Sequence, residues 1–555
     1  MSEQRVLDAV TTEVIRHALE TIVEEMRVSL RRTAYSVVVK DLLDFSCGLF
    51  DVRGRLLGAS VDIPTLLASM SPALTAALER WDGEIAQGDV LLTNHPYMGN
   101  AHTSDVNIFI PVYDEDGTHL GFAGTVCHHA DWGGRVPGTA AASNRSVFEE
   151  GVLYPAIKLE EGGRPNRSVY DILWANVRHP AQNQGDLRAQ IAAARTGERR
   201  LSRLAERYGA GLLLQPGAAL LAHSERRTRD AIGEMPDGTF EAEGFLDDDG
   251  LTLGVPVRIR ARVTIDGERM RVDFDGSSPQ IEGGGNCPLA TTRSVVHYGV
   301  KCLVPADIPF NEGSVAPIEI VAREGSLMNP RFPAAVGDRH HTAQRIADVL
   351  AQALSKAVPA RGAAGWFSGS PAIIIEAPSN TTGETSVLLS ILGGGTGAMD
   401  GADGASALDA HMSNCALIPA EVIESVYPLR IERCLLVPDS GGAGRWRGGL
   451  GLRVDMRVLG NLPLSVRIET EQACPAFAAP GLLGGEHGTP AEVWLDDGTT
   501  MTSLPAKGTT VVLPGEIVSV RSGGGGGYGN PTLRAPGARA ADARAGFTST
   551  ECPSN

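Results

Sequence analysis

Two apolar runs on either side of Asp116-Gly117 constrain the fold more than any other feature of the chain. They lie in VNIFIPVYDEDGTHLGFAGTVCHH, residues 106–129, and Asp-Gly is among the strongest signals for a two-residue hairpin turn. If these two residues form the loop, Glu115 pairs with Thr118 and the pairing continues along both strands. The same register then places Asp105 directly opposite His128.

The predicted register gathers ionisable side chains at the open end of this hairpin. Directly opposed residues on one face of an antiparallel pair have Cβ atoms about 4.5–5.5 Å apart, which brings Asp105 within reach of His128. The register also places His102 opposite Asp131. His102 and Asp105 are separated by only two residues, so we expect a tight loop after Gly99-Asn100 to bring them together.

The two consecutive histidines are expected to point in opposite directions, because side chains alternate along a strand. His128 shares the face of Asp105 and is predicted to bind a metal directly, whereas His129 is predicted to support it from behind. Two imidazoles with carboxylates suit a borderline divalent ion such as Mn²⁺, Zn²⁺ or Fe²⁺, and such an ion can activate water. We assign catalytic roles beside the metal to His129 and Asp131. On the pattern alone, a polar hairpin end held only by hydrogen bonds is an equal alternative.

The chain is too long for one compact core. With 555 residues and roughly 100–200 residues per domain, we expect a multi-domain protein of the mixed α+β class. We predict an N-terminal metal-binding domain with a helix and β hairpins, a mixed α/β middle domain, a glycine-rich β domain and a flexible tail, over residues 1–214, 215–435, 436–532 and 533–555.

Apolar residues at helical spacing predict helices over 12–34, 71–81, 186–208 and 342–358. The second is expected to begin at Ser71-Pro72, because proline is favoured in the first helical turn. His340 and His341 lie at the start of the last helix, where capping and surface roles are favoured over a place in a pocket wall.

Charge and composition exclude several classes of function. The net charge is −17, whereas nucleic-acid binding needs a basic face. The eight cysteines form no CxxC pair, which argues against a zinc ribbon or a redox motif. The N-terminus lacks the pattern of a signal peptide, and there is no apolar run long enough to span a membrane. We therefore expect a cytoplasmic protein.

Two glycine runs, 393–397 and 523–527, are predicted to form turns within β structure. Neither matches the phosphate-binding loop G-x-x-x-x-G-K-[ST]. A chain without this loop is not expected to hydrolyse ATP by itself.

Several longer stretches together resemble the hydantoinase B/oxoprolinase family over nearly the whole chain. They are KDLLDFSCGLFD, GDVLLTNHPYMGNAHTSDV, HHADWGG, EEGVLYPAIKL, NVRHP, GDLRAQIAA, DIPFNEGS, DSGGAGRWRGGLG and GGGGYGNP, in this order. The family includes β subunits of ATP-dependent hydantoinases and caprolactamase, the C-terminal half of 5-oxoprolinase, and large subunits of acetone and acetophenone carboxylases.

The resemblance implies a divalent metal held by His102, Asp105, His128 and an acidic residue, Asp41, with Asp44 as the nearby alternative. It also implies a hydantoinase A-type ATPase partner in a hetero-oligomer such as α2β2. The partner uses ATP to phosphorylate the carbonyl oxygen of a cyclic amide, and this subunit hydrolyses the intermediate with an activated water. The alternative is a subunit of an ATP-dependent ketone carboxylase.

The sequence departs from the family pattern at two places. NHP stands at 94–96 where many relatives have Asn-Asp-Pro, although oxoprolinases resemble this chain there. GTAAASNRS, residues 138–146, replaces a Gly-Ser-Met-Pro-Pro stretch that follows HHAD in relatives. Because this segment is expected to border the substrate, the resemblance does not identify which cyclic amide or ketone is used.

Overall fold

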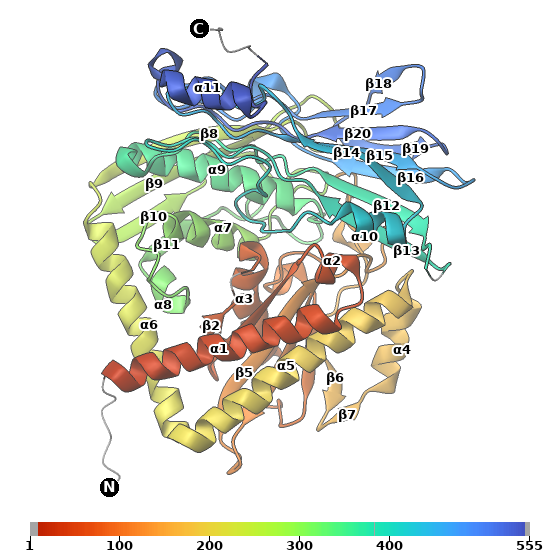
Figure 1. Cartoon of the computed structure of the whole chain (residues 1–555). Coiled ribbons are helices and arrows are strands. Elements are labelled where there is room, and N and C mark those ends of the chain that lie inside the picture. The colour runs from red at the N-terminus through yellow and green to blue at the C-terminus, as the bar shows by residue number, and fades with distance from the viewer. Residues whose placement is uncertain (1–8, 61, 382, 550–555) are drawn as a thin grey trace.

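The computed structural model describes residues 9–549, apart from 61 and 382. Figure 1 shows the N-terminal part of the chain as a lower layer, with the middle and C-terminal parts of the chain above it. The described residues form four β sheets accompanied by helices, which confirms the predicted mixed α/β architecture.

The N-terminal layer is built on a seven-stranded sheet in the order β2-β1-β5-β4-β3-β6-β7. Neighbouring strands in it are antiparallel. The strands are β1 (Phe45–Phe50), β2 (Leu56–Ala59), β3 (Val90–Thr93), β4 (Asp105–Tyr113), β5 (His119–His128), β6 (Ile157–Glu161) and β7 (Arg164–Pro165).

Helices cover both faces of this sheet, which explains why its central strands read as almost continuous apolar runs. On one face, Cys47 and Cys127 pack with residues of α1 (Ala9–Thr33) and α5 (Pro180–Tyr208). On the other, Phe109 and Val126 pack with α3 (Pro64–Trp81). The helix predicted to begin at Ser71 therefore begins seven residues earlier. Pro64 fills the first-turn position assigned to Pro72, which lies inside the helix.

The predicted hairpin register is confirmed, but the predicted turn is wrong. Asp105 pairs with His128, and the ladder continues with the same offset to Val112 opposite Gly121. A bulge then shifts the pairing, so that Tyr113 lies opposite His119 and the amide of Asp114 donates to the carbonyl of Thr118. The loop is thus one residue longer than expected, and the bulge restores the register on the side of the site.

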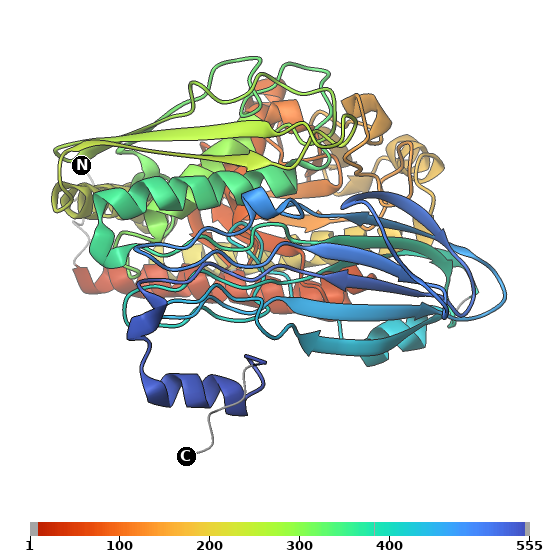
Figure 2. The same cartoon turned by 90° about the horizontal axis from the view of Figure 1, so that it is seen from above.

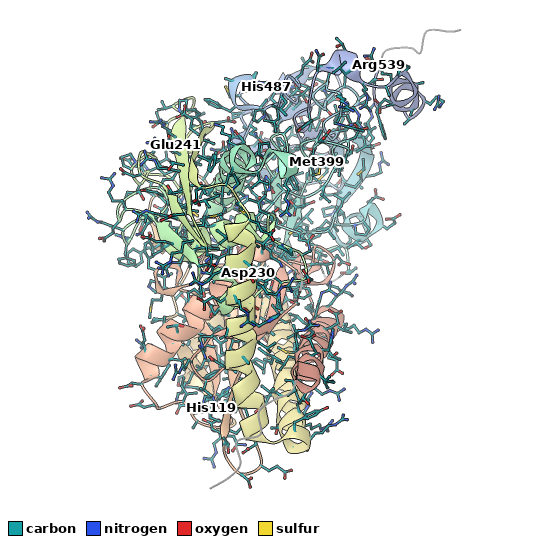
Figure 3. All side chains as sticks on the ribbon, turned by 90° about the vertical axis from the view of Figure 1, so that its left-hand side faces the viewer. His119, Asp230, Glu241, Met399, His487 and Arg539 are labelled. Atoms are coloured by element: carbon teal, nitrogen blue, oxygen red, sulfur yellow. The ribbon has the colours of Figure 1, made fainter. Side chains whose placement is uncertain are left out.

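The middle of the chain forms a four-stranded sheet in the order β11-β10-β9-β8. Long α9 packs on β8 and β9 and begins three residues before the predicted Thr342. Figure 3 shows α6, with Asp230 labelled, running along the side of the molecule between the lower layer and this sheet. The elements are α6 (Ala210–Gly233), β8 (Gly238–Leu246), β9 (Val257–Asp266), β10 (Arg269–Asp273), α7 (Leu289–Lys301), α8 (Glu312–Val315), β11 (Ile318–Val321) and α9 (Arg339–Ala357).

Two further sheets share one core, in the orders β13-β12-β16-β19 and β14-β15-β20-β17-β18. The boundary expected between residues 435 and 436 lies inside β14, and β12 pairs with β16 across it. The strands are β12 (Ala372–Pro378), β13 (Thr385–Ile391), β14 (Leu429–Leu436), β15 (Leu452–Val458), β16 (Leu464–Glu469), β17 (Glu492–Asp496), β18 (Met501–Ser503), β19 (Lys507–Val512) and β20 (Ile517–Arg521).

The glycine runs do not form turns. Residues 523 and 526 form backbone hydrogen bonds with 395 and 398, residues 524 and 527 with 489 and 486, and residues 525 and 528 with 449 and 446. The same neighbour recurs at every third residue, as expected for an extended helix with three residues per turn. A Cβ added to Gly525 would lie 2.0 Å from the carbonyl oxygen of Thr396, so only glycine fits there. Figure 2 shows wavy extended segments of this kind side by side next to the C-terminal strands.

The segment 533–555 was expected to be a flexible tail, but its described part contains helix α11 (Pro536–Arg544). Arg534 forms ion pairs with Asp403 and Asp542, which fasten this helix to the glycine-rich region. Residues 550–555 lie outside the described part. The remaining α-helices are α2 (Val37–Lys40), α4 (Arg167–Ala175) and α10 (Ala420–Val426). Within the described residues, no helix has the length and apolar character needed to cross a membrane.

Candidate metal centre

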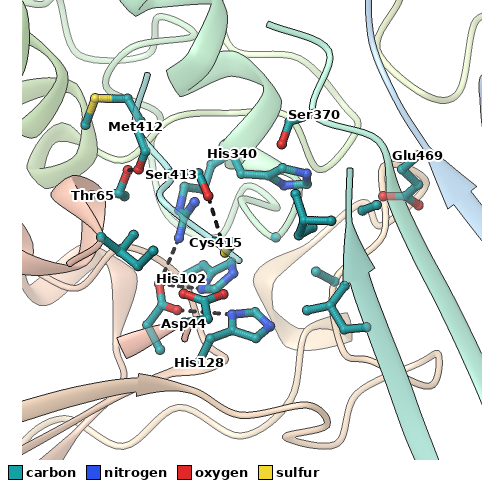
Figure 4. A pocket seen from close by; sticks show the side chains of 18 of the residues that line it. Asp44, Thr65, His102, His128, His340, Ser370, Met412, Ser413, Cys415 and Glu469 are labelled. Atoms are coloured by element: carbon teal, nitrogen blue, oxygen red, sulfur yellow. Dashed lines mark hydrogen bonds and ion pairs between the residues drawn. The ribbon is translucent and has the colours of Figure 1, made fainter. Parts of the chain in front are cut away.

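His102, Asp105 and His128 converge at the open end of the β4–β5 hairpin. One ligand atom from each lies within 4.8 Å of the others. His102 Nδ1 is 2.7 Å from Asp105 Oδ2, and His128 Nδ1 is 3.2 Å from Asp105 Oδ1. All three side chains are buried, and Figure 4 shows the two labelled histidines side by side at the floor of a cavity.

A tight loop brings His102 back toward Asp105, as expected. Gly99 has φ 97°, and a Cβ there would lie 2.4 Å from the backbone carbon of Pro72 in α3. The Asn100 side chain donates to the carbonyl oxygen of Asp105 at 2.6 Å. The amide of Asp105 in turn donates to the carbonyl of His102 at 3.2 Å. The glycine and the buried asparagine therefore set the position of the first histidine.

Strand alternation separates the two consecutive histidines, as predicted. His128 faces Asp105, whereas His129 Nε2 donates to the side-chain oxygen of Gln190 in α5 at 2.9 Å. The His129 ring also packs edge-on against Trp132, with centroids 4.8 Å apart. His129 therefore points into the α5 side of the sheet, away from the cavity.

Asp131 does not pair with His102, because the β4–β5 ladder ends at Asp105 and His128. Its carboxylate accepts hydrogen bonds from the amides of Gly133 and Gly138, both at 2.9 Å. Arg178 Nη1 forms an ion pair with it at 3.0 Å. Through these contacts, Asp131 holds the loop that follows β5 in place.

The nearby acidic residue at the cavity is Asp44, the alternative to Asp41. Asp41 caps the C-terminal end of α2, whereas Asp44 lines the cavity with the two histidines. The carbonyl of Asp44 accepts the amide of His128 at 3.0 Å, which ties β1 to β5 at this point. Burial raises the pKa of the Asp44 carboxyl to about 6.

Arg339, the first residue of α9, was not anticipated from the sequence. Its Nη2 is 2.8 Å from Asp105 Oδ2. Burial opposes ionisation of Asp105, but its close neighbours His102, Arg339 and His128 together outweigh burial and hold the pKa of this carboxyl well below its ordinary value. The start of α9 therefore keeps Asp105 anionic.

The residues present fit a divalent metal ion. Burial lowers the pKa of His102 to about 4, which favours the neutral imidazole that a metal requires. His102 Nδ1 has no hydrogen-bond partner among the described residues, despite its short distance to Asp105 Oδ2. The nitrogen and the carboxylate oxygen are close, but their angle does not suit a hydrogen bond. A cation bound by both atoms would explain this arrangement. Two imidazoles and carboxylates suit Mn²⁺, Zn²⁺ or Fe²⁺.

Comparison with known proteins identifies the family. The model of the hydantoinase B/oxoprolinase family matches residues 8–531. The chain belongs to this family. It is 34% identical to a putative B-type subunit of a D-/L-hydantoinase from Pseudomonas sp. (strain NS671), over 98% of this chain and 94% of that protein. It is 31% identical to 5-oxoprolinase 1 of Arabidopsis thaliana over 95% of this chain, but spans 42% of that protein.

Solved structures of two other proteins share the fold. The ATP-dependent caprolactamase from Pseudomonas jessenii superposes with a TM-score of 0.91 at 28% identity, covering 98% of this chain and 95% of that one. An acetone carboxylase in nucleotide-free form gives a TM-score of 0.88 at 20% identity, covering 99% and 79%. At the lower identity the likeness concerns the fold alone.

In this member of the hydantoinase B/oxoprolinase family, the cavity beside the candidate ligands has one apolar and one polar wall. The apolar wall comes from α3, β12, β13 and the segment before α10, with Ile63, Leu66, Ala372, Ile374, Leu389, Ile391 and Met412. The polar wall holds His340, Ser370, Arg467 and Glu469. These residues come from segments distant in sequence, so periodicity within one segment gave no signal for them.

A second group of possible ligands, Asp338, His340 and His341, lies at the start of α9. His341 Nδ1 is 2.8 Å from Asp338 Oδ1. The imidazole rings of His340 and His341 are tilted by 38° to each other, with centroids 3.8 Å apart. His340 lines the cavity, which is the alternative left open by the sequence, whereas His341 is buried behind it.

Proposed function

We propose that this chain is the metal-bearing subunit of an ATP-dependent cyclic-amide hydrolase. In this proposal a partner ATPase subunit phosphorylates the carbonyl oxygen of the amide, and the ring is opened in the cavity described above. The observation that carries the proposal is the convergence of His102, Asp105 and His128 on one buried point of a cavity wall. The relatives named as a hydantoinase, a 5-oxoprolinase and a caprolactamase support the substrate class.

In our proposal, His102, Asp105 and His128 hold the ion, and Asp44 is the fourth ligand in place of Asp41. A divalent ion at this point lowers the pKa of water and polarises a carbonyl or phosphoryl oxygen. The protein's own groups prepare this chemistry. Arg339 fixes the orientation of the Asp105 carboxylate, and the apolar wall excludes bulk water from the ring of the substrate.

His129 and Asp131 take positioning roles in this proposal. The hydrogen bond of His129 to Gln190 joins β5 to α5, which holds the backbone that carries His128. Asp131 fixes the loop that carries Gly138 and Ala140 into the cavity wall. Neither side chain is among the residues that line the cavity.

The test is turnover by the chain purified together with its ATPase partner. We expect ATP-dependent ring opening of one member of a panel of hydantoin, 5-oxoproline and caprolactam, independent of bicarbonate. His102→Ala should abolish turnover while the two subunits still co-purify. Bicarbonate-dependent consumption of acetone, with no lactam opened, would show a ketone carboxylase instead. Steady ATP hydrolysis by this chain alone would contradict the assignment of ATP use to the partner subunit.

A further inference from the structure

The polar wall of the cavity contains a buried arginine, two of whose donor nitrogens make no hydrogen bond to the described residues. Arg467 lies in β16 and is 6% exposed. Its Nε and Nη2 are buried and make no hydrogen bond to any described residue. The Arg467 side chain reaches its neighbour Glu469 only across 3.5 Å, from Nε to Oε1. A buried donor without a partner is costly to a folded protein, so the unused donors indicate a ligand.

The backbone around Arg467 is held rigidly. The residue pairs with Ile374 of β12 on one side and with Thr509 of β19 on the other. A strand paired on both sides does not readily turn its side chain away. The guanidinium is therefore fixed at the cavity wall by the sheet and not by a flexible loop.

Space beside the guanidinium is kept open by a glycine. Gly138 has φ 75°, and a Cβ there would lie 3.2 Å from Arg467 Nη2 and 2.8 Å from Ile374 Cγ2. Gly138 and Arg467 line the same cavity as the candidate metal ligands. The loop held by Asp131 thus places Gly138 beside Arg467, and only glycine leaves this space next to the guanidinium free.

The other buried cations near the cavity already have anionic partners. Arg339 is paired with Asp105, and Lys507 is paired with Glu471 and Asp248. Glu469 is a weak counter-ion for Arg467, because burial and the nearby Asp338 raise the pKa of its carboxyl to about 7. Arg467 therefore lacks the closely hydrogen-bonded carboxylate that Arg339 has in Asp105.

We propose that Arg467 binds an oxyanion of the substrate in the cavity that the candidate metal ligands also line. A planar guanidinium matches the oxygens of phosphate and carboxylate groups through paired hydrogen bonds. The oxyanion is either the phosphoryl group added in the ATP-dependent step or a carboxylate on the substrate ring. This inference rests on the proposed function for the identity of the substrate, but the anion site itself can be tested without turnover.

The first experiment measures anion binding to the purified chain by calorimetry, with inorganic phosphate and 5-oxoproline as separate probes. Wild type should bind at least one probe, and Arg467→Gln should weaken that binding at least tenfold. Arg467→Lys, which keeps the charge without the planar fork, should fall between them and serves if the glutamine variant does not fold. Arg331→Gln, an exposed arginine outside the cavity, is the control. Equal binding by wild type and both Arg467 variants, or no binding of either probe by wild type, overturns the proposal.

The second experiment identifies the source of the oxyanion in the complex with the ATPase partner. It compares 5-oxoproline with 2-pyrrolidinone, the same ring without a carboxylate. If Arg467 holds the phosphoryl group, Arg467→Gln lowers kcat/KM for both lactams by a similar factor. If it holds the ring carboxylate, only 5-oxoproline is affected. Unchanged kcat/KM for both overturns the proposal. If wild type opens neither ring, the proposed function fails for these substrates, while the calorimetry still decides the anion site.

Discussion

Arg339 at the start of α9 donates to Asp105 at the start of β4 over 2.8 Å, although the two residues are 234 positions apart. This ion pair joins the middle of the chain to the N-terminal layer at the candidate metal centre. The sheet that supplies the ligands and the helix that orients one of them therefore meet in a single buried contact. Loss of either partner affects both the folded state and the site.

We predict that Asp105→Asn removes the metal and destabilises the protein. Asparagine keeps the shape of the side chain but leaves Arg339 buried without its counter-charge, and breaking a buried pair typically costs about 3–5 kcal/mol. Metal content by mass spectrometry and the free energy of unfolding in urea measure the two effects. The double variant Asp105→Asn/Arg339→Met should recover much of the stability and none of the metal. A stable, fully metallated Asp105→Asn protein would contradict the assignment.

The two consecutive histidines should behave differently when each is replaced by alanine. His128→Ala should lose nearly all bound metal. His129→Ala should keep its metal but lower the free energy of unfolding by roughly 1–3 kcal/mol, because Gln190 loses its buried partner. Metal analysis beside urea unfolding distinguishes these results. The reverse pattern, with His129→Ala as the metal-free variant, would mean that the faces of β5 have been assigned the wrong way round.

Glu150 should make the protein less stable as the pH rises from about 4.5 to about 8. Burial raises the pKa of this carboxyl from 4.5 to about 8 in the folded chain, although it accepts the amides of Val336 and Gly337. The folded state then binds more protons than the unfolded state across this window, so the free energy of unfolding falls with increasing pH. Above pH 8 both states are ionised and the effect is complete.

The matched variant for this pH dependence is Glu150→Gln, which keeps both hydrogen bonds without a titrating group. Urea unfolding between pH 5 and pH 8.5 should show a flatter profile than wild type and a higher stability at pH 8. Glu79→Gln, at an exposed position of α3, should leave the wild-type slope unchanged. Parallel profiles for wild type and Glu150→Gln would show that another group is responsible.

Gly525→Ala should prevent folding or lower stability by more than about 3 kcal/mol, because the added methyl group meets backbone that cannot move aside. Its Cβ would lie 2.0 Å from the Thr396 carbonyl oxygen. Gly508→Ala is the control, since a Cβ at that position of β19 meets no atom within 4 Å. It should change the free energy of unfolding by less than about 1 kcal/mol. Similar melting curves for the two variants would disprove close packing in this region.

Local patterns in the sequence predicted the hairpin and the convergence of its ends, because both depend on neighbours along the chain. The pairing of Asp105 with His128 was correct even though the turn at Asp116-Gly117 was misjudged. A bulge at Val112 compensates for the longer loop, and nothing in the sequence marks that bulge. The start of α3 was misplaced because two prolines, Pro64 and Pro72, could each occupy a first turn.

The polar wall could not be predicted, because its residues meet only through tertiary packing. Within it, Arg467 lies in a strand whose pattern indicates burial but not which residues the side chain will meet. The same holds for Arg339, which begins a helix and contacts Asp105. Whether Asp41 or Asp44 reaches the cavity likewise depends on where α2 ends. The two residues are only about one helical turn apart, so a small error in that end exchanges them. The glycine runs were taken for turns because glycine is common in turns, whereas here it is required by contact between backbones.

The three-residue period of residues 523–528 has a consequence for how this chain can change length. Inserting one residue would rotate everything after it by a third of a turn, and each amide would then face a different neighbouring segment. Inserting three residues would keep every later amide aimed at its original neighbour. Insertions and deletions in this part of the molecule are therefore expected in multiples of three residues. Surface loops have no such restriction.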